Sequence, residues 1–153
     1  MRTSERNTDR EAAVRAMAGA LVEVVETMFF ELPLDEVREG LPPAEGRAAW
    51  TAFGGTHAGW LEVRLEEGAA RRLAANFLGR EDEWTVTEPE IELVALELAN
   101  ILCGNALSRL DPGGRFRIEA PRLERRSEEG GPWLAAPLES GRVALRAGFE
   151  AQS

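Results

Sequence analysis

Several residue types that carry enzyme chemistry are missing or scarce in this chain of 153 residues. It contains no lysine and no tyrosine, so it has no amine for a Schiff base, no P-loop lysine and no phenol to act as an acid or a nucleophile. Its one cysteine, Cys103, cannot form an internal disulfide or a thiolate metal site alone. Its one histidine, His57, has no Cys, Asp or Glu at ligand spacing. We therefore expect neither redox chemistry nor a bound metal.

Long apolar runs and a surplus of positive charge are also absent. No stretch approaches the ~20 apolar residues that a bilayer span needs, and the N-terminus is polar where a signal peptide would be apolar. The formal net charge of −9 argues against sequence-independent binding to nucleic acid or to anionic membranes. We therefore expect a cytoplasmic protein with no nucleic-acid and no membrane partner.

The remaining composition is that of an ordinary globular protein. Hydrophobic residues make up 44% of the chain and charged residues 29%, and the length suits one domain with a core of its own. Residues 1–9 are polar and lack periodicity, which predicts a disordered N-terminus. The expected domain covers residues 10–153.

Hydrophobic spacing predicts helices where apolar residues recur every three or four positions and strands where they alternate with polar ones. The expected helices cover residues 10–30, 69–78 and 88–110, and the expected strands cover 48–53, 59–65, 115–123, 133–138 and 143–149. Short turns between the last three strands predict an antiparallel meander. The fold class is therefore α/β (α+β), a mostly antiparallel sheet with two long helices packed on it.

The helix expected over residues 88–110 carries polar residues that a plain core helix would lack. Five apolar residues share one face of a helical wheel, which we expect to pack on the sheet: Ile91, Val94, Leu98, Ile101 and Leu102. Asn105 falls on the same face, where a buried amide without partners would cost roughly 1–3 kcal/mol. We therefore expect Asn105 to be a structural residue that hydrogen-bonds a neighbouring loop or strand.

The opposite face of this helix combines Glu97 and Asn100, whose side chains lie next to each other and can approach one target together. Gly104 costs about 1 kcal/mol relative to Ala in a helix and leaves a dent where a partner's backbone could come close. We expect four residues to contact a partner around the polar pair: Leu93, Leu96, Gly104 and Leu107. From these residues alone the face is either a partner-binding or catalytic surface, or a second buried surface or dimer contact.

The segment ELANILCGN, residues 97–105, resembles the motif of the CheC/CheX-type chemotaxis phosphatases, and that of CheX in particular. The family's mark is Glu-x-x-Asn with a second Asn later in the same helix. A single copy of Glu-x-x-Asn is similar to CheX, because members of the CheC group often carry two. One position departs from the fuller family pattern, since Leu93 stands where other members carry Asp or Ser.

The resemblance implies a phosphatase that acts on the phosphorylated aspartate of a CheY-like response regulator in chemotaxis or related two-component signalling. As the resemblance implies it, Asn100 would orient the attacking water and Glu97 would pair with a lysine of the regulator. No cofactor of the chain's own is implied, because the regulator supplies the Mg²⁺. The resemblance also implies a homodimer.

Two other functions fit the same residues. One is a non-catalytic adaptor or dimerisation module that binds a signalling partner without hydrolysis. The other is a structural component like those of the flagellar switch, built on a related fold. Accelerated loss of phosphate from a regulator would separate the phosphatase from both.

Overall fold

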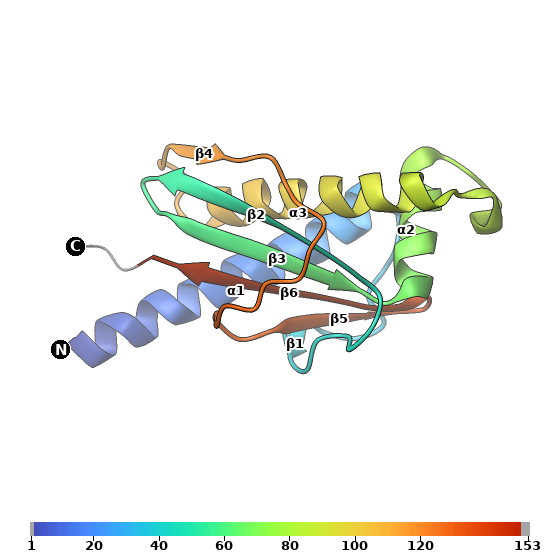
Figure 1. Ribbon diagram of the computed structural model, residues 1–153. Coiled ribbons are helices and arrows are strands. Elements are labelled where there is room, and N and C mark those ends of the chain that lie inside the picture. The colour runs from blue at the N-terminus through green and yellow to red at the C-terminus, as the bar shows by residue number, and fades with distance from the viewer. Residues whose placement is uncertain (1, 151–153) are drawn as a thin grey trace.

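The computed structural model describes residues 2–150 and, from Asp9 onward, also the surroundings of their side chains. The helices pack against one face of a single sheet (Figure 1). The helices are α1 (Arg2–Met28), α2 (Glu67–Leu78) and α3 (Glu88–Leu110), with a 3-10 turn η1 (Glu83–Thr85) before α3. The strands are β1 (Arg38–Glu39), β2 (Arg47–Gly55), β3 (Gly59–Leu65), β4 (Phe116–Ile118), β5 (Leu134–Leu138) and β6 (Gly141–Phe149).

The α+β class with a mostly antiparallel sheet is confirmed, and the predicted long helices both form. Helix α1 begins at Arg2, ahead of the predicted start at residue 10, while Met1 lies outside the described residues. The division of the chain into a disordered segment 1–9 and a domain 10–153 stays a prediction.

Every strand pair in the sheet is antiparallel, and the strand order is β1-β5-β6-β3-β2-β4. The predicted meander of the last three strands is wrong, because β4 pairs with β2 at one edge while β5 pairs with β6 near the other. The segment 119–133 between them is not a short turn. It crosses the sheet on the face opposite the helices, as Figure 1 shows.

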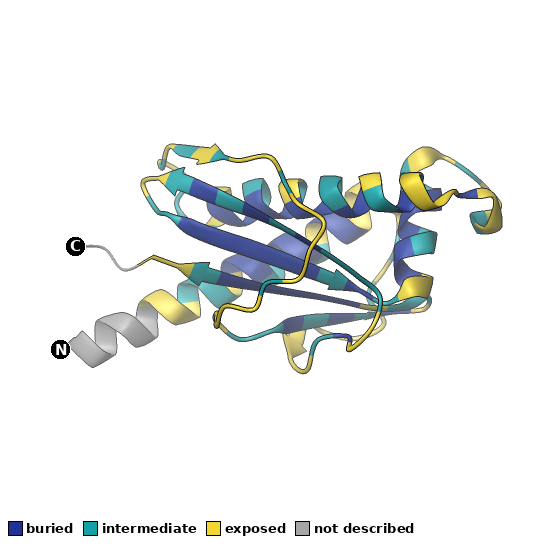
Figure 2. Cartoon of the chain, viewed as in Figure 1, coloured by how far each residue is buried: buried dark blue, intermediate teal, exposed yellow. Residues whose placement is uncertain are grey.

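The core lies between the sheet and the helices, and Figure 2 shows the buried residues concentrated there. Phe29 directly after α1, Leu98 and Leu102 of α3, and Val63 and Leu145 of the central strands are all fully buried. Burial of this apolar surface is the main stabilising term, at roughly 25 cal/mol per Å² removed from water.

Helix α3 is long and apolar enough, by length and composition alone, to cross a membrane. Half of that apolar stretch is buried inside the protein, where α3 packs against α1, α2 and strand β2. Its apolar composition follows from this packing, since other elements cover most sides of the helix.

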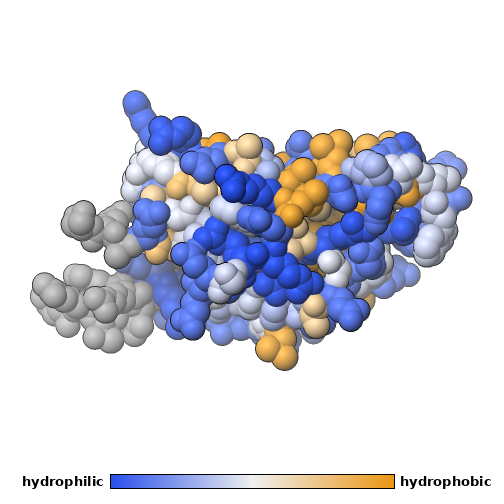
Figure 3. Space-filling view, viewed as in Figure 1, coloured by the Kyte–Doolittle hydropathy of each residue, from blue (hydrophilic) through white to orange (hydrophobic). Residues whose placement is uncertain are grey.

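The outer face of the sheet is covered by stacked arginine and tryptophan side chains, and Figure 3 shows hydrophilic residues across the middle of this face. Guanidinium carbons lie 4.1–5.5 Å from the indole ring centroids, within cation–π range. The stack contains three tryptophans and four arginines: Trp50, Trp60, Trp133, Arg64, Arg122, Arg126 and Arg146.

Glu62 lies beneath this stack with 0% of its surface exposed. Its carboxylate accepts hydrogen bonds of 3.0 Å from Nε of Arg64 and of Arg146, and one of 3.2 Å from the backbone N–H of Arg126. A buried charge needs this pairing to offset its lost hydration. Glu62 therefore joins the crossing segment 119–133 to the centre of the sheet.

Glu62→Gln should lower the free energy of unfolding by about 3 kcal/mol, because it leaves guanidinium groups without their buried counter-charge. The measurement is urea unfolding followed by circular dichroism. The control is Glu128→Gln, since Glu128 pairs with Arg126 at the surface and exposed pairs contribute little. Equal stability of the two variants would contradict the role given to Glu62.

Candidate functional site

The start of helix α3 is fixed by a capping box. The backbone N–H of Glu90 donates to Oγ1 of Thr87 at 3.4 Å, and the backbone N–H of Thr87 donates to Oε1 of Glu90 at 3.0 Å. The bond from the Thr87 backbone is the main reason that the pKa of Glu90 lies below its ordinary value. Because the first turn is fixed, the direction of every later side chain on α3 is fixed with it.

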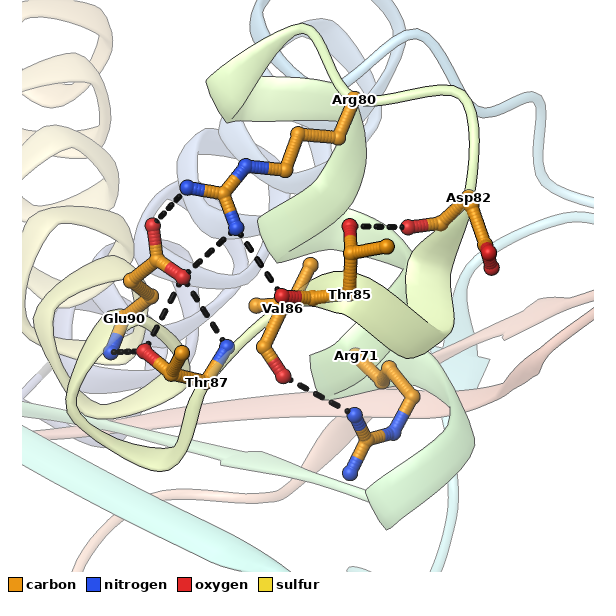
Figure 4. Close-up of polar contacts among 7 residues, drawn as sticks. All are labelled: Arg71, Arg80, Asp82, Thr85, Val86, Thr87 and Glu90. Atoms are coloured by element: carbon orange, nitrogen blue, oxygen red, sulfur yellow. Dashed lines mark hydrogen bonds and ion pairs between the residues drawn. The ribbon is translucent and has the colours of Figure 1, made fainter.

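The segment before α3 is held to α2 by arginines, as Figure 4 shows. Arg80 forms an ion pair with Glu90 and also donates to the backbone carbonyl of Thr85 at 3.1 Å. Arg71 donates to the carbonyl of Val86 at 3.2 Å. Arg71, in the first half of α2, and Arg80, just after α2, thus join this helix, the 3-10 turn and the capping box into one support for α3.

Glu97 and Asn100 both lie on the outward face of α3, as the helical wheel predicts. Asn100 is exposed, Glu97 is half-buried, and Leu93 is 53% exposed one turn before Glu97. Within the described part of the chain, neither Glu97 nor Asn100 forms a side-chain hydrogen bond or an ion pair. Both side chains are therefore available to groups from another molecule.

The partner-contact residues predicted around this pair divide between surface and core. Leu93, Glu97, Asn100 and Gly104 form an outward stripe along α3. Leu96, in contrast, is half-buried and packs against the core. The prediction for Leu107 is wrong, because only 3% of it is exposed and it faces an apolar space beside Phe53 of β2. Near its C-terminal end α3 packs against both α1 and the sheet, and this buries a position that the wheel places outside.

Cys103 is also buried, and this burial raises the pKa of its thiol to about 12. A thiol of this kind stays protonated at neutral pH and is inert as a nucleophile.

Asn105 does not lie in the core, which corrects the wheel assignment. It is half-exposed on the side of α3 that faces α1, where its Nδ2 donates to Oε2 of Glu23 at 3.3 Å. Its Oδ1 accepts from Nε of Arg109 at 2.8 Å, and Arg109 forms an ion pair with Glu23. The hydrogen bond from Arg109 is the main reason that the pKa of Glu23 is lowered. The amide thus links two helices instead of binding a loop or strand.

A surface hollow of about 360 Å³ adjoins the outward stripe beside these residues. It is lined by Glu23, Ile101, Gly104, Asn105, Ser108 and Arg109. Sequence reasoning missed Glu23 and Arg109 here, because nothing in the pattern of α1 indicates which turn of α3 it meets.

His57 lies just past the C-terminal end of α3. Its Nε2 is 3.4 Å from Oδ2 of Asp111, just after α3, and its ring stacks on Phe116 with centroids 6.0 Å apart. Among the described residues, no group of three or more His, Cys, Asp or Glu side chains is arranged to hold a metal ion.

Residues 47–129, more than half of the chain and including all of α2 and α3, match the family model described as chemotaxis phosphatase CheX. Among curated protein sequences, none matches the chain.

Solved structures share the fold. The chemotaxis protein CheX from Vibrio vulnificus is 21% identical, with a TM-score of 0.69 over 90% of this chain and 96% of that one. CheX in the CheX-CheY-BeF3-Mg complex from Borrelia burgdorferi is 16% identical, with a TM-score of 0.71 over 90% and 97%. The FliM middle domain from a Vibrio species is 12% identical, with a TM-score of 0.58 over 91% of each chain.

Thr87→Ala should lower the free energy of unfolding by about 1 kcal/mol, because it removes the side-chain acceptor at the start of α3. Thermal unfolding of this variant is compared with that of Thr87→Ser, which keeps the hydroxyl and should retain most of the stability. If both variants unfold at the same temperature as the wild type, the capping box does not hold the motif helix.

Proposed function

The chain belongs to the CheX family of chemotaxis phosphatases, and from this premise we propose that it removes the phosphoryl group from the phosphorylated aspartate of a CheY-like response regulator. The observation that supports this most directly is the outward pair of Glu97 and Asn100, which has no partner among the described residues. The pair lies on a capped, well-packed helix, so its geometry is set before any partner arrives.

In the proposed reaction, Asn100 enters the active site of the regulator and its amide orients a water molecule in line with the phosphorus–oxygen bond. The water oxygen attacks phosphorus, the bond to the aspartate oxygen breaks, and the products are inorganic phosphate and a free carboxylate. Such a transfer depends on positioning and on electrostatic stabilisation more than on covalent chemistry from the protein. An amide without a nucleophile beside it is sufficient for this task.

Glu97 lies one turn before Asn100 and is proposed to pair with a lysine of the regulator. An ion pair at the edge of the reaction centre fixes the register in which Asn100 enters. The formal charge of −9 favours approach to a positively charged surface of that kind. The Mg²⁺ that phosphoryl transfer requires is proposed to be held by the regulator.

A CheY-like protein as the partner is supported by the family and by the Borrelia burgdorferi complex, which contains CheX and CheY. Chemotaxis as the pathway is supported in the same way. Self-association into a homodimer and a cytoplasmic location stay predictions.

The second candidate is the non-catalytic adaptor. The exposed Leu93 favours it, because an apolar side chain at this position adds docking surface and no polar group to the reaction centre.

Asn100→Ala should lower the rate constant for phosphate loss at saturating protein by about 100-fold, because it removes the group that positions the water. Glu97→Ala should mainly raise the concentration of protein that gives half-maximal rate. Neither variant should unfold below the wild-type temperature, since neither side chain has a partner within the described chain and alanine is the better helix former. The measurement is the decay of a phosphorylated CheY-like regulator from the same organism.

The control is Glu39→Ala, which removes an exposed carboxylate from β1 at the edge of the sheet and should leave the decay rate unchanged. Wild-type protein that binds the regulator without speeding decay would favour the adaptor. Full activity in Asn100→Ala would show that the water is positioned by another group.

A further inference from the structure

The outward stripe of α3 continues past Asn100 into the surface hollow. Gly104 follows Asn100 by one helical turn, roughly 6 Å along the helix axis, and the hollow begins there. Ile101 and Gly104 contribute its apolar part, while Glu23 and Arg109 contribute its charged part. The hollow is therefore continuous with the surface that the regulator must reach.

The charged part of the hollow is held in one geometry by both helices. The guanidinium of Arg109 lies over Gly19 of α1, where a Cβ would stand only 2.8 Å from Nη1. Nε of Arg109 donates to Asn105 at 2.8 Å, and Nη2 pairs with Glu23. Gly19 thus provides the space for Arg109, and three contacts hold the side chain across the gap between α1 and α3.

This arrangement leaves hydrogen-bonding capacity unused. The Nη1 donors of Arg109 and the Oε1 acceptor of Glu23 have no hydrogen-bond partner among the described residues, and the two side chains are 40% and 48% exposed. The Arg109 donor and the Glu23 acceptor lie side by side next to the apolar part of the hollow. Together they can hydrogen-bond a polypeptide backbone, which presents both a C=O and an N–H.

We propose that this hollow is a second docking contact for the regulator and binds a backbone segment of it that lies across Gly104. The inference rests on the proposed function, since it places the same partner on the same helix. A specific interface buries about 800 Å² on each partner, far more than one Glu and one Asn provide. A regulator that brings its phosphoryl group to Asn100 therefore also covers a hollow that begins one turn away.

Gly104→Ala separates an effect on docking from an effect on folding, because it should weaken binding of the regulator while it stabilises the fold. A Cβ at this position would lie 3.6 Å from Cδ1 of Ile118, an ordinary contact, and alanine is the better residue in a helix interior. The melting temperature should therefore rise by about 2–4 °C. The added methyl group should raise the Kd for a regulator carrying beryllofluoride by about tenfold, while kcat stays within about twofold of wild type.

The matched control is Gly40→Ala, where a Cβ would lie 3.9 Å from that of Ala135, away from α3. It should leave the Kd unchanged. Ser108→Gln is the second variant, because it fills the hollow from an exposed position on its rim and should also weaken binding. Loss of affinity in both hollow variants together with a wild-type Kd in the control supports the proposal.

The outcomes distinguish this inference from the proposed function. If the wild type speeds dephosphorylation and both hollow variants bind as tightly as it does, the second contact is wrong and the phosphatase stands. If the wild type binds without catalysis and the hollow variants bind more weakly, the contact stands and the phosphatase fails. If the wild type neither binds nor speeds decay, both are wrong.

Discussion

The rest of the structure depends on the packing of α3 against three neighbours at once. The sheet, α1 and α2 together cover most of its circumference, and the capping box with Arg80 fixes its first turn. What remains outside is one narrow stripe that carries Leu93, Glu97, Asn100 and Gly104. Because the helix is held firmly, the backbone that carries Glu97 and Asn100 does not have to become ordered when a partner binds. This lowers the entropic cost of forming the complex.

The outward pair could be predicted from sequence because it depends only on local geometry. Residues three apart on a helix are neighbours wherever the helix lies, so the direction shared by Glu97 and Asn100 holds in the structure. The environments of Asn105 and Leu107 depend instead on where α1 and the sheet meet α3. A wheel drawn from one helix contains no information on its neighbours, and for this reason it placed Asn105 in the core and Leu107 outside.

The fold shows the same difference between features that depend on local sequence and features that depend on distant contacts. Alternating apolar residues marked most of the strands correctly, since strand formation follows a local period. The separation of β4 from β5 was not visible, because residues 115–123 alternate like one strand and the residues after them resemble a short turn unless their distant contacts are known. Its attachment depends on Glu62 and on tryptophans that lie some 60 to 80 residues away along the chain. Pairings over such distances leave no periodic signal in the sequence.

Two residues that weaken α3 as a helix lie on its outward stripe. Asn100 and Gly104 are both poor helix formers, and neither gains a contact inside the described chain that would offset this cost. In a helix with good caps and a well-packed core, such exceptions are expected at surfaces selected for binding or chemistry. The proposed hydrolysis of an acyl phosphate depends mainly on the position of a water molecule, so it would need no more from this chain than a rigid helix with one amide and one carboxylate. Packing of the buried side of α3 stabilises the helix, so the residues of the outward stripe do not have to contribute to that stability.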